Sequence, residues 1–515
     1  MKNKQFILNI LFTLLSFIIT TGINFFLTPY ITKHIGTEAY AFVSLANNFV
    51  NYASIVTLAI NSMASRFIAI SYHRKNLEDA NKYFNSVVIT NLFLILMLFL
   101  PSVLCIVFLD KILVIPTNLQ VFVKILFGLV FANFFFGLLN TIFSVATFVK
   151  NRVDLTNLRT LESNIIKVFV MIGLFIIFDA NIVFVGVASL IATIYLLIFN
   201  IWYTKKLIPE IKCSPKYFEL KKIVEIFKSG IWNTITKIGQ VLSDGLDLLI
   251  TNWFVTPFAM GQLAYAKTLS SCMSSFSAAL SSVFQPNLTS YFAKEKNEDV
   301  VEEFKFSMKI SCFLSNILLA GLIVFGIDFF NLWIPGQNIN LIYAATFVTI
   351  IGSIVGTAIN SLFSVFTITN KLKINSLVTL TQGLLNIIIV YILLRIGLCR
   401  GYEIVLISGV NVFISIVKNL TFTPMYSAYC LNIKKNSFYP TIFNGILSAI
   451  ILSVIFYIIR IIHIPTSWVA LLFSAFICTT FGLIANFLIL FNKNQRKKVV
   501  DIIKNKLKKG DEAHE

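Results

Sequence analysis

Four ionisable side chains fall inside stretches that are otherwise apolar enough to cross a membrane. They are Lys237, Asp244 and Asp247 in one stretch and Lys267 in the next. A charge at the centre of a bilayer costs about 2.5–3.5 kcal/mol on insertion scales, so such residues do not face lipid. These residue types therefore predict either a watery cavity or ion pairs between helices.

The spacing of the polar residues places them on single helix faces. Side chains that recur at alternating steps of three and four share one face of an α-helix. The stripe in the seventh apolar segment consists of Asn233, Lys237, Gln240, Asp244, Asp247 and Thr251. Polar stripes also run along the first, second and eighth segments, and the second holds the amides Asn47, Asn48 and Asn51, with Arg66 after them. The simplest arrangement is a central hydrated cavity lined by these four helices.

Each polar group also has a purely structural interpretation. Ser and Thr stripes are typical of closely packed membrane helices. The charges of the seventh helix could lock it to a neighbour as an ion pair. Lys267 could extend to the membrane surface, and Arg66 could be an ordinary cytoplasmic anchor.

The elements that position these residues are expected to be transmembrane helices. Of the 515 residues, 57% are hydrophobic and only 13% are charged, against about 25% charged in a typical soluble domain. Apolar runs of roughly 20 residues, the length that spans a bilayer core, recur along the chain. We expect an all-α integral membrane protein with about fourteen helices, at 7–30, 40–63, 84–108, 119–149, 160–178, 181–204, 229–253, 261–284, 306–331, 340–369, 375–397, 403–428, 438–462 and 467–491.

The distribution of basic residues predicts the orientation of these helices. The chain has 42 Lys and Arg against 23 Asp and Glu, and most of the basic residues fall in alternate loops and in the C-terminal tail. Because basic loops stay in the cytoplasm, both termini of this multi-pass protein are expected there. The net charge of +19 is thus explained by the membrane and not by nucleic acid. The basic tail is expected to touch anionic membrane lipid.

An internal repeat predicts the domain organisation. The sequence LNTIFSVAT at 139–147 returns as INSLFSVFT at 359–367, an offset of 220 residues. This offset places helix one on helix seven, so the halves have six helices each and run in parallel, as in many transporters. The expected parts are a six-helix bundle over 1–204, a cytoplasmic linker over 205–228, a second bundle over 229–430, two additional helices over 431–491 and a tail over 492–515.

Three stretches resemble one membrane protein family. They are FFLTPYITKHIGTEAYAFVSLAN at 25–47, NSMASRF at 61–67, and GLDLLITNWFVTPFAMGQLAYAKTL at 245–269. With the layout of six, six and two helices, they are similar to the bacterial polysaccharide flippases. These are the Wzx-like exporters of O-antigen or capsule units within the multidrug/oligosaccharidyl-lipid/polysaccharide exporter superfamily.

The resemblance implies a pair of bundles that alternates between inward-open and outward-open states around a cationic cavity. The implied partner is an undecaprenyl-pyrophosphate-linked glycan, with a polysaccharide polymerase and glycosyltransferases acting in the same pathway. On this interpretation Lys237, Lys267 and Arg66 hold the pyrophosphate or an acidic sugar. Sugar hydroxyls bind Asn47, Asn48, Asn51 and Gln240. Asp244 and Asp247 depart from a purely cationic cavity, which suggests coupling to a cation or proton.

Other activities stay open or are disfavoured. A lipid II or teichoic acid precursor flippase fits the same sequence features, and a multidrug cation antiporter of the superfamily would have twelve helices and an acidic cavity. The sequence contains no P-loop, serine triad, paired catalytic carboxylates or metal-ligand cluster, so neither an enzyme nor a bound cofactor is expected.

Overall fold

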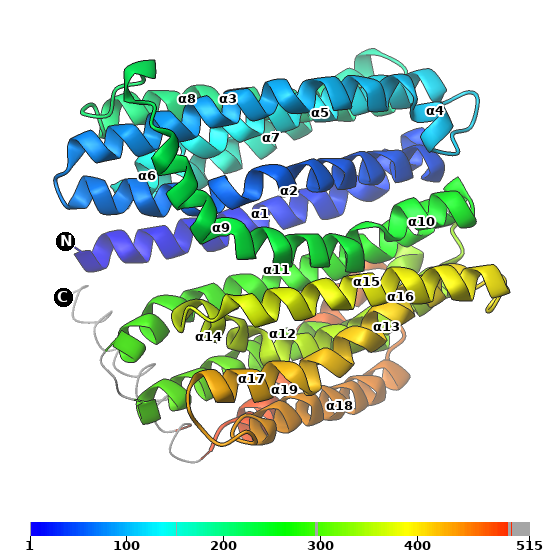
Figure 1. Cartoon of the computed structure of the whole chain (residues 1–515). Coiled ribbons are helices and arrows are strands. Elements are labelled where there is room, and N and C mark those ends of the chain that lie inside the picture. Colours follow the sequence, from blue (N-terminus) through cyan, green and yellow to red (C-terminus); the bar gives the residue numbers. More distant parts are fainter. Residues whose placement is uncertain (1, 151, 294–296, 493–495, 497–515) are drawn as a thin grey trace, which may run out of the picture. The chain divides into compact units, whose positions relative to one another are not determined.

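The described part of the chain consists of helices joined by short turns and loops (Figure 1). The computed structural model describes residues 2–150, 152–293, 297–492 and 496. Most of the basic tail, and with it the expected lipid contact, lies outside these residues. The α-helices are α1 Lys2–Ile35, α2 Thr37–His73, α3 Leu77–Val107, α4 Leu109–Ile112, α5 Gln120–Phe143, α6 Val145–Val149, α7 Val153–Ile177, α8 Ile182–Leu207, α9 Leu220–Gln240, α10 Asp247–Phe254, α11 Pro257–Ala293, α12 Asn297–Trp333, α13 Ile339–Ile359, α14 Phe363–Ile368, α15 Leu372–Ile396, α16 Glu403–Leu420, α17 Phe422–Cys430, α18 Tyr439–Ile462 and α19 Trp468–Leu490. Short 3₁₀ turns, η1 Pro215–Tyr217 and η3 Asn360–Leu362, and a π-helical turn, η2 Val241–Gly245, complete the set.

The predicted fold class is confirmed. Within the described residues, eleven helical segments are long and apolar enough to cross a membrane. Three further long segments, α1, α11 and the run from α9 to α10, correspond to the first, eighth and seventh predicted helices. These three are segments in which the sequence places polar stripes, which lower the hydropathy of a helix. The chain is therefore an all-α, multi-pass membrane protein.

Contacts divide the chain into two compact units. The first comprises Met1–Tyr265 and Leu372–Ile407, and the second comprises Ala266–Lys371 and Ser408–Glu515. In the second unit, α12 packs against α13, α18 and α19, around a core that includes Leu319, Ile350 and Ala449. The repeat predicts a division along the sequence into two six-helix halves. That division stays a prediction.

Both copies of the repeated sequence lie where a long helix is interrupted. Between α5 and α6 the helix breaks at Ser144, and between α13 and α14 it passes through the 3₁₀ turn η3. In the first copy, the hydroxyl of Thr204 donates to the Phe143 carbonyl oxygen at 2.9 Å, and the Asn200 amide donates to the Asn140 side chain. The helices expected to be continuous over 119–149 and 340–369 are thus each divided. The breaks lie near the ends that the charge distribution predicts to be cytoplasmic.

The segment between α8 and α9 is fixed to α3 by buried polar side chains. Asn81 accepts from the Lys212 backbone N–H at 2.7 Å, and Asn85 accepts from the Ser214 N–H at 2.7 Å. The hydroxyl of Ser86 accepts from the backbone N–H of Glu219 at 2.8 Å. These bonds satisfy backbone groups that no helix or sheet would otherwise pair. The expected linker 205–228 is therefore an ordered part of the first unit.

The seventh helix begins earlier than the sequence predicts. The expected start was residue 229, whereas α9 begins at Leu220. Its first turns are amphipathic, because Ile223 and Ile226 are buried while Lys221 and Lys228 are exposed. Periodicity over the first ten residues could have revealed this extension, but the lysines at 221, 222 and 228 suggested a loop.

Glycines let the seventh helix approach two neighbours closely within the first unit. A Cβ at Gly230 would lie 1.8 Å from the carbonyl oxygen of Ala59 on α2. A Cβ at Gly239 would lie 2.5 Å from the Thr379 carbonyl group on α15, and one at Gly383 would lie 2.5 Å from the Gly239 oxygen. Small residues that bring backbones together are typical of membrane helix interfaces. The seventh helix is therefore packed tightly between α2 and α15.

Replacing Gly239 by alanine should destabilise the first unit. The added methyl group meets backbone atoms of Thr379, which cannot rotate away, and overpacking of this kind costs about 1–3 kcal/mol. Thermal unfolding of the purified protein in detergent measures the effect. The matched control is Gly173→Ala on α7, where a Cβ meets nothing within 4 Å. Equal melting temperatures for the two variants would contradict the tight crossing.

Candidate functional site

The seventh helix contains a π-helical turn at its centre. The turn η2 spans Val241–Gly245 and includes Asp244. A π turn inserts an extra residue into the helix, leaves carbonyl groups outside the regular hydrogen-bond pattern and is frequent at functional sites. It also rotates the residues that follow it relative to those before it. The turn thus makes the middle of this helix chemically unlike a continuous transmembrane helix.

Side chains from two neighbouring helices bind the carbonyl groups of this turn. The Asn386 amide on α15 donates to the Ser243 carbonyl oxygen at 2.8 Å. From α2, the Tyr52 hydroxyl donates to the Gly245 carbonyl oxygen at 2.6 Å, and the Asn48 amide donates to the same oxygen at 3.3 Å. Three polar side chains therefore hold the backbone of the seventh helix at its irregular point.

The two carboxylates of the seventh helix have different environments. The Asp244 side chain lies in the π turn and is exposed. Asp247 is the first residue of α10 and is 1% exposed, and its carboxylate lies near the Tyr52 hydroxyl. Thr251, one turn later, is also buried and donates to the Asp247 carbonyl oxygen at 2.7 Å. Because of the extra residue in η2, the polar stripe is not the single continuous face that regular spacing predicts.

The remaining predicted residues of the first unit are mostly accessible. Lys237 is half-buried on α9, and Gln240, its last residue, is exposed. On α2, Asn47 and Asn51 are exposed, and the Asn47 amide donates to the Val43 carbonyl of its own helix at 2.9 Å. Arg66 is exposed and lies toward the far end of the same helix. The structure therefore brings the Asn47–Asn51 segment of α2 beside η2.

Lys267 belongs to the second unit. It lies on α11, where its side chain is half-buried. Nearby on the same helix, the Ser270 hydroxyl shares a 2.7 Å hydrogen bond with Thr349 of α13. Two turns further along α11, the buried Ser277 hydroxyl lies 3.1 Å from the Thr357 hydroxyl. Part of the polar stripe of the eighth helix thus serves packing against α13, as the structural interpretation predicts.

Three polar residues that matter in the structure had no assigned role in the sequence interpretation. Tyr52 and Asn386 bind the π turn, and Lys167 lies inside α7. Lys167 is ten residues before the end of α7, which is about 15 Å along the axis, so its side chain cannot easily reach either membrane surface. One turn earlier, the Asn164 amide donates to the Thr20 hydroxyl of α1 at 2.9 Å. An isolated Lys or Asn within an apolar run was the available signal for both Lys167 and Asn386.

Replacing Asn386 by leucine should weaken the structure around the π turn. The Ser243 carbonyl would lose its partner in a buried position, which costs about 1–3 kcal/mol. Thermal unfolding of the purified protein measures the loss. The control is Thr381→Val on the same helix, because the exposed Thr381 hydroxyl donates to the Leu377 carbonyl of its own helix, one turn away. Unchanged stability of the Asn386 variant would show that the Ser243 carbonyl finds another donor.

Comparison with known proteins shows which family the chain belongs to. Residues 6–292 match the family model described as "Polysaccharide biosynthesis protein". A relative from Bacillus subtilis (strain 168), described as the uncharacterized membrane protein EpsK, is 27% identical over 498 residues, covering 96% of this chain and 97% of its own.

Two solved structures share the fold. The lipid II flippase MurJ in an inward closed conformation is 15% identical with a TM-score of 0.60, and the match covers 92% of this chain and 98% of that one. An inward-facing multidrug resistance transporter of the MATE family in the MOP superfamily is 14% identical with a TM-score of 0.61, and the match covers 81% and 94% of the two chains.

Proposed function

Because the chain belongs to the polysaccharide biosynthesis protein family, within a superfamily of membrane flippases and exporters, we propose that it translocates a lipid-linked oligosaccharide across the bacterial cytoplasmic membrane. The lipid is of the undecaprenyl-pyrophosphate type, and the product feeds surface polysaccharide such as O-antigen or capsule. The termini face the cytoplasm, which a reporter fused after residue 515 tests by its accessibility.

The observation that supports the proposal most directly is the polar, irregular centre of the seventh helix. Each hydroxyl carried unpaired into hydrocarbon costs roughly 4–8 kcal/mol, so a sugar head group needs polar partners all the way across. The π turn, the accessible Asp244 and Gln240, and the amides of α2 beside it supply donors and acceptors within the first unit. No covalent step is needed for such a passage.

Each polar group has a role in this proposal. Lys237, Lys267 and Arg66 attract the pyrophosphate or an acidic sugar. The amides of Asn47, Asn51 and Gln240 are accessible and bind hydroxyl groups. Asn48 uses one N–H for the Gly245 carbonyl, and its second N–H and its side-chain oxygen are proposed to bind a sugar. One side chain would then link the π turn to the substrate.

The carboxylates are proposed to couple transport to a cation or proton. Asp244 is exposed, whereas Asp247 is buried near Tyr52. A buried carboxylate meets a cation or proton from solution when a conformational change opens its surroundings. In alternating access such a change of surroundings accompanies each cycle, which makes Asp247 the better candidate for coupling and Asp244 the better candidate for substrate contact.

Alanine replacements test the proposed path. Lys237→Ala, Asp244→Ala and Lys267→Ala, with Asp247→Asn, should each lower export of surface polysaccharide at unchanged protein level. Loss of one charge-assisted hydrogen bond corresponds to roughly tenfold in rate or affinity. Lys434→Ala, in an exposed loop of the second unit, is the control and should export normally. Full export in all four variants would refute this path. If the variants instead make the cells more sensitive to cationic drugs and leave surface polysaccharide unchanged, a multidrug antiporter is favoured.

A further inference from the structure

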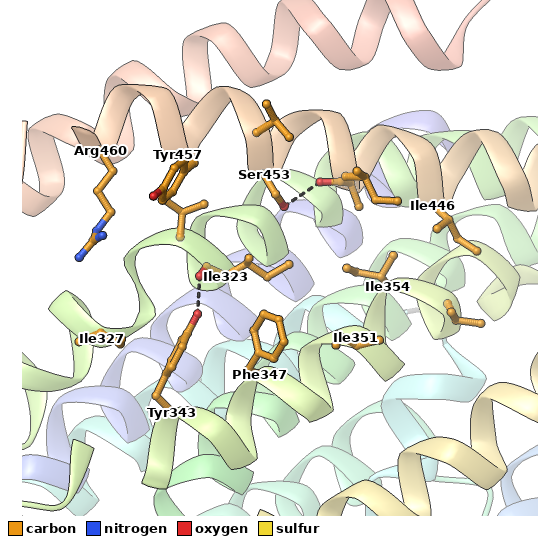
Figure 2. Close-up of a pocket in the computed structure, with 15 residues that line it drawn as sticks. Ile323, Ile327, Tyr343, Phe347, Ile351, Ile354, Ile446, Ser453, Tyr457 and Arg460 are labelled. Atoms are coloured by element: carbon orange, nitrogen blue, oxygen red, sulfur yellow. Dashed lines mark hydrogen bonds between the residues drawn. The ribbon is translucent and has the colours of Figure 1, made fainter. Parts of the chain in front are cut away.

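The second unit contains an elongated cavity that the proposed function does not use. It has a volume of about 640 Å³ and lies between α12, α13 and α18 (Figure 2). Its walls are apolar, with Ile351 and Ile354 from α13 and Ile450 and Val454 from α18. Ile450 and Val454 are each more than half exposed, at 55% and 56%. The cavity is therefore a groove that is open along α18, which we call the α18 groove.

One end of the α18 groove is polar and the other is not. Figure 2 shows Arg460, Tyr457 and Tyr343 at one end and Ile446 and Ile354 toward the other. Arg460 lies in the last turn of α18. Arginine and tyrosine at the end of a membrane helix are typical of the level of lipid head groups. The groove thus runs from that level toward the interior of the membrane.

At the polar end of the groove, a carboxylate holds the guanidinium of Arg460 in place. Arg460 donates to Asp328 of α12 through Nε at 2.7 Å and through Nη2 at 3.1 Å. The Asp328 side chain is 10% exposed, whereas that of Arg460 is 28% exposed. A guanidinium has five N–H groups, so this pairing leaves donors on the outer edge. Asp328 therefore fixes the orientation of Arg460 and leaves the outer edge of the guanidinium accessible.

The length of the groove matches one leaflet of a bilayer. From Ile446 to Arg460 the rise along α18 is about 21 Å. The hydrocarbon of one leaflet is about 15 Å deep, with head groups beyond it. A lipid whose phosphate lies at Arg460 would thus have an acyl chain long enough to follow the wall down to Ile446.

We propose that the α18 groove binds one glycerophospholipid, with an acyl chain along α18 and the phosphodiester on the open edge of Arg460. An apolar groove within the membrane is filled by hydrocarbon, because neither water nor a polar chain is stable there. The head-group end offers one guanidinium edge, which matches a singly charged phosphodiester better than a pyrophosphate. The bound lipid is a structural component of the second unit and not the transported substrate.

Filling the groove tests the position of the chain. The full-length protein, purified in detergent, is incubated with phosphatidylglycerol and examined by native mass spectrometry. Wild type should retain one phospholipid, and Ile450→Trp should bind it roughly tenfold more weakly. Ile458→Trp is the matched control, since Ile458 is similarly exposed on the same helix but does not line the groove. Equal retention by the two variants overturns the proposal. If Ile450→Trp does not fold, Val454→Phe takes its place.

The head-group contact is tested by a double variant that removes both charges of the ion pair. Arg460→Gln with Asp328→Asn removes the cation without leaving a buried carboxylate alone, and it should weaken phosphatidylglycerol binding roughly tenfold. Unchanged binding overturns the role of Arg460. Polyprenyl phosphate is added in competition. If it displaces phosphatidylglycerol at lower concentration, the groove is a site for the tail of the transported lipid and the proposal fails, whereas weaker competition supports it.

Discussion

The first unit depends on hydrogen bonds that side chains of neighbouring helices donate to two backbone carbonyl groups of the seventh helix. A membrane offers no water to a broken helix, so the carbonyls freed at the π turn need partners from within the protein. Asn386 supplies one to Ser243, and Tyr52 and Asn48 supply two to Gly245. This arrangement allows an irregular, charged segment to persist inside an apolar bundle, and it ties α2, α15 and the seventh helix into one structure.

The same constraint explains how the rest of that unit is organised. Glycines bring α2 and α15 close enough for short side chains to reach the turn. The asparagines of α3 fix the segment that leads into α9, so the start of the seventh helix is also held in place. Polar side chains that make these bonds serve the fold in the observed state. Those that remain accessible, such as Gln240 and Asp244, are the ones available to a solute.

Much of the fold could be predicted from the sequence, because bilayer thickness sets the length of every apolar run. Lengths of roughly 20 residues and the spacing of polar residues indicated a multi-pass helical protein and which helices carry polar stripes. The π turn could not be predicted, since nothing in the residues Val241–Gly245 distinguishes an extra residue from a regular turn. Asn386 was missed because its partner is a backbone carbonyl, which leaves no mark in side-chain periodicity. The early start of α9 was hidden by lysines that suggested a loop.

We propose that this chain moves a lipid-linked oligosaccharide from one leaflet to the other. The most direct measurement reconstitutes the purified full-length protein in liposomes that carry an undecaprenyl-pyrophosphate-linked oligosaccharide. A lectin outside then reports how much glycan reaches the outer leaflet. The account predicts transfer from the inner leaflet that depends on the protein and falls when Lys237 is replaced by alanine. Transfer of the glycan no faster than in protein-free liposomes would contradict this prediction. Exchange of a lipophilic cation in the same vesicles would show that the protein is active there.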